Sequence, residues 1–91
     1  MSYRLQIAPA AARQLRGLPR KVLERVDVRI LALATEPRPP GARHLEGDLY
    51  RIRVGNIRVV YTVSDTIRVV LIVAAADRKE VYRLLKRMGY L

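Results

Sequence analysis

The apolar residues of this chain recur with two different periods, and each period predicts a different kind of secondary structure. Alternating apolar and polar residues, or a short apolar run bounded by turn residues, are typical of a β-strand. Apolar residues at intervals of three and four are typical of a helix with one buried face. The predicted strands are residues 3–7, 49–54, 57–64 and 67–74, and the predicted helices are residues 9–18, 19–34 and 77–88.

The order of these elements predicts the fold class. It reads strand, helix, helix, three-stranded meander and helix, which is an α+β arrangement. We expect a twisted, mostly antiparallel four-stranded sheet with the helical hairpin on one face. The proline-rich segment 35–41 is predicted to be a loop, and the nearly all-apolar strand 67–74 to be central with both faces covered. No linker or repeat divides the chain, so residues 1–91 are expected to form a single domain.

The dipeptide Gly55-Asn56 separates two predicted strands and has the residue types of a two-residue hairpin turn. Such a turn would place Arg53 opposite Arg58, with Arg51 two residues further along the same strand. Paired residues share a face of a sheet, as do alternate residues of one strand, so the three arginines would project from one side. An anion between them, such as a phosphodiester, would turn their mutual repulsion into binding energy. A solvated outer face that carries scattered cations is the alternative interpretation.

The charge balance supports a polyanionic partner. The chain has 18 basic and 8 acidic residues, for a net charge of +10 at pH 7. A small domain this positive attracts nucleic acid, or alternatively an acidic protein or an anionic membrane surface. The absence of cysteine excludes disulfides, thiolate metal sites and thiol catalysis. The sequence contains neither a signal-peptide pattern nor an apolar run of membrane-spanning length, so we expect a cytoplasmic protein with no membrane partner.

A few other side chains are candidates for chemistry. Tyr82 lies off the apolar stripe of the last predicted helix, and it either stacks on a base and positions a hydroxyl or closes the helix against the sheet. Arg78, at the start of that helix, is either a fourth phosphate ligand or a solvated first-turn residue. His44, the only histidine, is expected in or near a loop without a catalytic role. The scattered acidic residues predict no metal site, and the absence of a glycine-rich phosphate motif predicts no cofactor.

The segment from residue 44 to residue 61 combines several short motifs. A Leu-x-Gly lead-in is followed by a Tyr-Arg-Ile-Arg strand, a glycine turn and an Arg-Val-x-Tyr strand. With the opening Ala-Ala-Arg-Gln-Leu-Arg-Gly-Leu-Pro of residues 11–19 and the closing Asp-Arg-Lys-Glu-Val-Tyr of residues 77–82, this pattern resembles the RelE/ParE toxin superfamily. Within it, the pattern looks like a RelE-type toxin of a type II toxin–antitoxin system. The resemblance covers nearly the whole chain and implies a RelE-like fold.

The resemblance also implies an activity. RelE-type toxins are ribosome-dependent endoribonucleases that inhibit translation by cleaving mRNA through attack of a 2′-hydroxyl on the adjacent phosphate, without a metal. By this analogy Arg51 and Arg53 would polarise the phosphate and the attacking hydroxyl. Arg58 would stabilise the charged transition state, and Tyr82 would position or help deprotonate the nucleophile.

Two departures from the family pattern affect the expected rate. RelE-type sites often place lysine on the first strand of the meander, where this chain has arginine, which stays protonated and is a poor general base. The family arginine that protonates the leaving oxygen aligns nearest Ala76, so Arg78 would have to substitute for it. We therefore expect slow or context-dependent cleavage.

The resemblance implies three partners: the ribosome, mRNA, and a cognate RelB-like antitoxin whose acidic segment wraps the basic face in a hetero-oligomer. Two other functions stay open from the sequence. One is a ParE-like inhibitor of DNA gyrase, which would have the same fold without the catalytic constellation. The other is a basic module that binds RNA or ribosomes without cleaving them.

Overall fold

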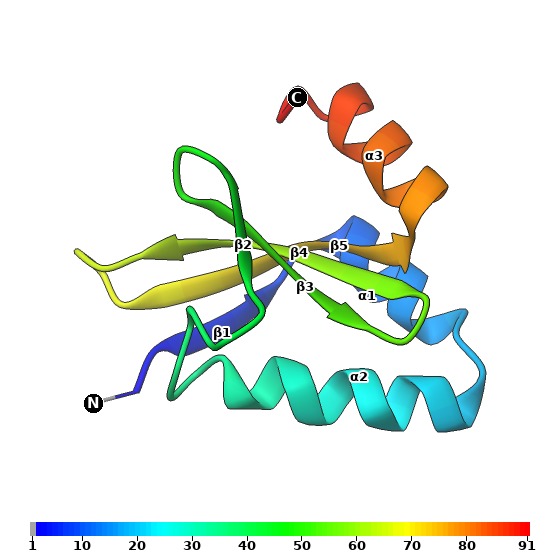
Figure 1. Cartoon of the computed structure of the whole chain (residues 1–91), viewed down its shortest axis with the longest axis horizontal. Helices are drawn as coiled ribbons and strands as arrows, with labels where there is room; N and C mark the ends of the chain where they lie inside the picture. Colours follow the sequence, from blue (N-terminus) through cyan, green and yellow to red (C-terminus); the bar gives the residue numbers. More distant parts are fainter. Residues whose placement is uncertain (1) are drawn as a thin grey trace.

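The computed structural model describes residues 2–91 and contains one five-stranded sheet with helices on both faces (Figure 1). In chain order the elements are β1 (Arg4–Ile7), α1 (Pro9–Arg16), α2 (Arg20–Ala32), β2 (Arg43–Glu46), β3 (Leu49–Val54), β4 (Ile57–Ser64), β5 (Val69–Asp77) and α3 (Arg78–Arg87). The strand order in the sheet is β1-β5-β4-β3-β2. Only the β1–β5 pair is parallel. The predicted α+β class and mostly antiparallel sheet are confirmed.

The predicted number of strands is wrong, because the sheet has five strands and not four. The additional strand is β2, which pairs antiparallel with the first half of β3 and has an irregular register between His44 and Glu46. It has only four residues and one apolar side chain, Leu45, so it lacks the alternation by which a strand is recognised. It pairs with β3 as a hairpin across the two-residue turn 47–48, in which Gly47 has a positive φ of 56°.

The predicted limits of the last strand are also wrong: β5 is Val69–Asp77 and not residues 67–74. Ile67 is exposed, and Arg68 has a positive φ of 58°, so both belong to the turn before the strand. Its central position is confirmed, because β5 lies between β1 and β4. A bulge interrupts its pairing with β4: Val60 pairs with Ala74 and Tyr61 with Ile72, which leaves one residue of β5 unpaired.

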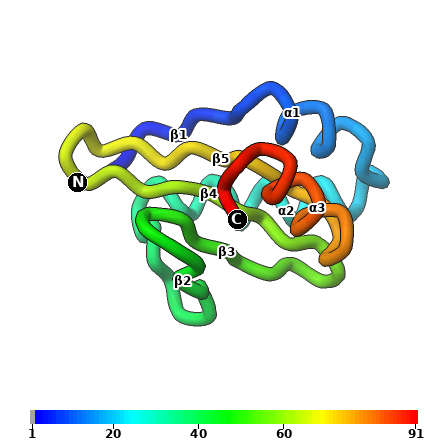
Figure 2. Tube along the Cα trace, turned by 90° about the horizontal axis from the view of Figure 1, so that it is seen from above, coloured from blue at the N-terminus to red at the C-terminus, as the bar shows by residue number. Residues whose placement is uncertain are grey.

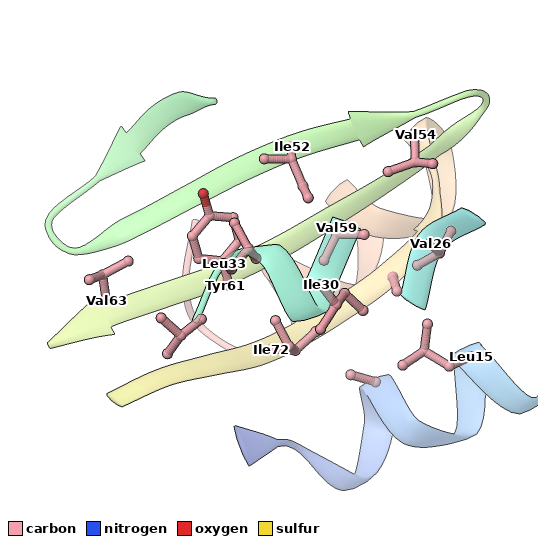
Figure 3. Close-up of a cluster of buried hydrophobic side chains, with 13 residues drawn as sticks. Leu15, Val26, Ile30, Leu33, Ile52, Val54, Val59, Tyr61, Val63 and Ile72 are labelled. Carbon is pink, nitrogen blue, oxygen red and sulfur yellow. The ribbon is translucent and has the colours of Figure 1, made fainter. Parts of the chain in front are cut away.

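Two separate hydrophobic clusters cover the two faces of the sheet. The larger cluster packs α1 and α2, the predicted helical hairpin, against one face (Figures 1 and 3). In Figure 3, Leu15, Val26 and Ile30 of these helices point toward the strands. The smaller cluster packs α3 against the other face, and its buried members are Leu49, Val60, Val73, Ala74, Val81 and Leu85. The view in Figure 2 shows α3 above the sheet and α2 beneath it.

Both ends of α3 have the residue types that commonly end a helix. The Asp77 side chain accepts a hydrogen bond of 2.9 Å from the backbone N–H of Glu80, which makes Asp77 the N-cap. At the other end, Gly89 has a positive φ of 85°, the conformation in which glycine commonly follows the last turn of a helix. The N-cap fixes the direction in which the first turn of α3 leaves β5.

The proline-rich loop before β2 is held against the sheet by the tyrosine hydroxyl of β4. Tyr61 is fully buried, and its hydroxyl donates a hydrogen bond of 2.7 Å to the carbonyl oxygen of Pro37. Burial disfavours the charged phenolate and raises the pKa of Tyr61 from 10.0 to about 12. Next to this bond, the ring of Tyr50 stacks on that of Tyr61 with 6.1 Å between the centroids.

A second tie joins the same loop to the turn between β4 and β5. Arg38 donates two hydrogen bonds to the carboxylate of Asp65, of 2.9 and 3.3 Å, and Tyr3 donates a third from its hydroxyl. These bonds favour the ionised carboxylate, so Arg38 first and Tyr3 second lower the pKa of Asp65. The pKa of the Arg38 guanidinium is raised for the same reason. Basic and acidic groups are therefore paired at this end of the sheet.

Candidate nucleic-acid interface

The β3–β4 hairpin has the predicted register. Arg53 pairs with Arg58 and Arg51 pairs with Val60. Gly55 has a φ of 60°, whereas no positive φ occurs at Asn56, so the turn requires the glycine at its first position, as type II′ turns do. The predicted placement of the three arginines on one face of the sheet is confirmed, and Val60 of the α3-side cluster identifies it as the face that α3 covers.

A fourth arginine belongs to this row and was not predicted from the sequence. Arg43 of β2 pairs with Arg51 of β3, so it lies on the same face. The four residues Arg43, Arg51, Arg53 and Arg58 are called the basic row below. Arg43 could be recognised only with β2 in place, because its position depends on the pairing of that strand.

At one end of the basic row, a depression lies between the β3–β4 turn and the start of α3. Figures 1 and 2 show these two segments side by side. The depression, called the α3 depression below, is lined by Asn56, Arg58, Asp77, Arg78 and Lys79. Its lining includes both Arg58 and Arg78. The sequence suggested Arg58 from the hairpin register and Arg78 from its place at the start of the last helix. The N-terminus of α3 adds a partial positive charge at the same place.

The side chains of Arg51 and Arg53 are arranged differently from that of Arg58. Arg53 is exposed, and its Nε donates a hydrogen bond of 3.1 Å to the carbonyl oxygen of Gly55, so the side chain lies toward the turn. Arg51 is half-buried in the sheet, and its Nε is inaccessible to solvent and has no hydrogen-bond partner among residues 2–91. The backbone thus puts the three arginines on one face, and their convergence on a single phosphate stays a prediction.

Tyr82 is half-buried and packs against the α3-side cluster. This contact agrees with the interpretation that its ring closes the helix against the sheet. Its hydroxyl makes no hydrogen bond within the described part of the chain, so the oxygen is available to a ligand. Both interpretations of Tyr82 are compatible with this placement, and its catalytic role stays a prediction.

No acidic side chain of the described residues forms an ion pair with the basic row. Among residues 2–91, the ion pairs join Arg20 to Glu24, Arg38 to Asp65 and Arg83 to Glu80, and none involves a member of the row or Arg78. Asp77 lines the α3 depression, but one of its oxygens is bound by the helix N-terminus. Arg58, Arg78 and Lys79 outnumber that one carboxylate, so the lining of the α3 depression has a net positive charge, which suits a phosphodiester or an acidic peptide.

His44 lies outside this arrangement. It is in β2, and its Nε2 is 2.6 Å from the carbonyl oxygen of Gly47, so it bridges the turn between β2 and β3. Its ring lies tilted against that of Tyr50, with 5.0 Å between the centroids. The structure assigns it a local structural role. In the described chain, no three histidine or acidic side chains are grouped closely enough to hold a metal ion, and no helix is long and apolar enough to cross a membrane.

Comparison with known families decides the identity of the fold. Residues 5–82 match the family described as the ParE toxin of the type II toxin–antitoxin system parDE. The chain belongs to this toxin family. Comparison of the sequence with curated proteins gives no significant match.

Solved structures place the toxin within the RelE/ParE superfamily. The toxin is 26% identical to a double-arginine mutant of Escherichia coli RelE, with a TM-score of 0.80 and coverage of 97% of this chain and 99% of that one. It is 30% identical to a chain of the RelE–RelB complex from Pyrococcus horikoshii, with a TM-score of 0.74 and coverage of 86% and 97%. A YoeB/ParE toxin from Agrobacterium tumefaciens shares the fold at 15% identity, with a TM-score of 0.71 and coverage of 82% and 98%.

Proposed function

We propose that this toxin is an endoribonuclease of the RelE type, which cleaves mRNA on the ribosome without a metal and thereby inhibits translation in the cytoplasm. The observation that carries the proposal is the α3 depression at the end of the basic row. There, Arg58 of β4 and Arg78 of α3 line one hollow beside a helix N-terminus, with no ion pair to either guanidinium. Similarity to RelE structures over nearly the whole chain supports the same branch.

The chemistry would use charge stabilisation more than proton transfer. The 2′-oxygen of one nucleotide forms a bond to the adjacent phosphorus, the bond from phosphorus to the 5′-oxygen breaks, and a cyclic phosphate end results. Negative charge increases on the phosphoryl oxygens in the transition state, and in this proposal Arg58 and Arg78 would stabilise it. Arg51 and Arg53 would bind the flanking backbone, and the free hydroxyl of Tyr82 would position the attacking 2′-hydroxyl.

The proposed site lacks an efficient donor of the proton that the leaving 5′-oxygen needs. Ala76 pairs with Arg58 across β4 and β5, so it lies on the same face of the sheet. Its methyl group cannot donate a proton. Arg78 begins the helix two residues later, and arginine holds its proton too firmly to be an efficient acid. A slow cleavage step follows from this geometry.

An acidic antitoxin is the proposed second partner. Structures similar to this one include RelE–RelB complexes from Pyrococcus horikoshii and Escherichia coli. A negatively charged segment laid across the basic row would neutralise it and exclude RNA at the same time. A hetero-oligomer of toxin and antitoxin would therefore be silent until the antitoxin is removed.

Cleavage on ribosomes programmed with a defined mRNA tests the proposal. The wild-type toxin should produce cuts within the ribosome-bound codon region. Arg58→Ala should lower the single-turnover rate by about 10² to 10³, the effect of removing one donor that stabilises transition-state charge. Arg87→Ala, which removes an exposed charge at the far end of α3, is the matched control and should cleave normally. An inactive wild-type toxin would refute the ribonuclease proposal.

Inhibition of DNA gyrase is the second candidate, because the matching family is described by its ParE toxin. A gyrase supercoiling assay with the same preparations separates the two functions. Inhibition of supercoiling together with intact mRNA would favour gyrase inhibition over ribonuclease activity. The triple substitution of Arg51, Arg53 and Arg58 by alanine should abolish ribonuclease toxicity while the fold, followed by circular dichroism, stays intact.

A further inference from the structure

A second basic site lies on the other side of the hairpin turn, at the open edge of β3. β2 pairs with β3 only as far as Arg51, so within the described chain the last residues of β3 have a strand, β4, on one side only. A cavity of about 460 Å³ lies at this edge, between β3 and α2. It is called the edge cavity below, and its lining residues are Glu24, Arg25, Val28, Arg29, Arg53, Val54 and Gly55.

Two guanidinium groups converge on the backbone of the turn. A methyl group added at Gly55 would lie 3.2 Å from Nη2 of Arg25, so that guanidinium packs directly against the glycine. Arg53 reaches the same residue from the strand and donates a hydrogen bond of 3.1 Å to its carbonyl oxygen. Arg29, one helical turn after Arg25 on the same face of α2, lines the same cavity.

These three cations are not neutralised within the described chain. Glu24 is the acidic residue of the cavity lining, and it forms an exposed ion pair with Arg20, with 3.6 Å between nitrogen and oxygen. Arg25, Arg29 and Arg53 take part in no ion pair of residues 2–91. A fold gains nothing from gathering like charges, whereas an anion between them would remove the repulsion. The exposed apolar side chain of Val28 offers a surface on which a ribose or a base can pack.

The edge cavity and the α3 depression are connected around the turn. A further hollow shares Arg25, Val54 and Gly55 with the edge cavity, and it shares Asn56 with the α3 depression. Neighbouring hollows therefore follow one another from α2, past the hairpin tip, to the N-terminus of α3. Cations line both ends of this path.

We infer that the edge cavity is a second phosphate-binding site, which holds the single-stranded RNA that extends beyond the cleavage site. The inference rests on the proposal that the ligand of this toxin is RNA. It adds the direction in which the RNA strand leaves the cleavage site, which the basic row alone does not define. Arg25 and Arg29 would bind phosphates and would take no part in the chemical step. Arg53 would belong to both sites, since it lies on the basic row and lines the edge cavity.

Binding of 2′-O-methyl RNA, which has no nucleophile and cannot be cleaved, tests this inference with the full-length toxin. Fluorescence anisotropy would measure the affinity for a labelled single strand of about 12 nucleotides across a range of salt concentrations. The double variant Arg25→Ala/Arg29→Ala should bind about tenfold more weakly than the wild type. The slope of log K against log salt should fall by about 1.4, or about 0.7 for each lost phosphate contact.

The matched control is Lys86→Ala/Arg87→Ala, which removes the same charge from the last turn of α3, outside both hollows. It should keep nearly the wild-type affinity and slope. Equal losses in the two double variants would mean that Arg25 and Arg29 act only through net charge, and would overturn the inference. It would also be overturned if the Arg25/Arg29 variant lost affinity for mRNA-free ribosomes or for an acidic peptide but kept its affinity for the strand.

The cleavage assay distinguishes failure of this inference from failure of the proposed function. If the wild-type toxin does not cut mRNA but its binding to the RNA strand still depends on Arg25 and Arg29, the ribonuclease proposal is refuted and the second phosphate-binding site is supported. If the toxin cuts mRNA but its affinity for the strand does not change when both arginines are replaced, the ribonuclease proposal stands and the second phosphate-binding site is refuted.

Discussion

The charged residues at the two ends of the sheet differ in what they contact. At one end, Arg38 and Asp65 are bound to each other and tie a loop to a turn. At the other end, Arg58 and Arg78 line a hollow without an acidic partner among residues 2–91. The same arginine side chain is therefore structural in one place and available to a ligand in the other. Contacts, and not residue type, separate the two roles.

Asp65→Asn should reduce the dependence of stability on acidic pH. The folded state lowers the pKa of Asp65 below its usual 3.8, so the carboxylate contributes stability above that value and loses it as pH falls through the folded-state pKa. Urea unfolding at pH 7 and at pH 3 should show a smaller difference for the variant than for the wild type. Asp27→Asn, on the exposed face of α2, should behave as the wild type does. An identical loss in all three proteins would contradict this role of Asp65.

At the scale of elements, the sequence predicts best where local chemistry decides the outcome. Gly55 fixes the hairpin, and with it the register that puts Arg53 opposite Arg58. The capping oxygen of Asp77 likewise fixes the start of α3. β2 escaped prediction because it is short and has a single apolar residue, so no alternation marks it, and Arg43 was missed with it. The direction of the Arg53 side chain depends on the carbonyl oxygen of the turn, which no periodicity reveals.

Gly55→Ala should destabilise the toxin by about 1–2 kcal/mol, the usual free energy of placing a side chain in the left-handed region. The new methyl group would also press on the Arg25 guanidinium, which is flexible and can move aside. Gly17→Ala is the matched control. Gly17 has a φ of −83°, and the nearest atom to an added methyl group is 3.5 Å away, so the change should stay within about 0.5 kcal/mol. Equal urea midpoints for the two variants would mean that the turn tolerates a side chain.

At the scale of the whole molecule, the sheet separates two cores of unequal size. The core on the α1/α2 side has 13 buried residues and the core on the α3 side has six, of which Val81 and Leu85 come from α3. α3 therefore packs against a smaller core than the helical hairpin does. α3 also carries Arg78 and Lys79, which line the α3 depression. An element with few buried contacts opens at a lower free energy than the global unfolding of the protein. The site proposed for RNA therefore includes the element that we expect to open first.

Leu85→Ala tests this coupling between α3 and the site. Removing a fully buried leucine typically costs about 2–5 kcal/mol, and here the loss should fall on the packing of α3 against β4 and β5. Native-state hydrogen exchange should show lower protection for the amides of α3, with a smaller change in the central strands, and RNA should bind more weakly. Leu33→Ala, an equally buried leucine of the opposite core, should lower protection throughout and leave α3 no worse than the strands. If Leu85→Ala lowered protection equally in α3 and β4, the helix would unfold only with the sheet, and its opening could not regulate access to the α3 depression.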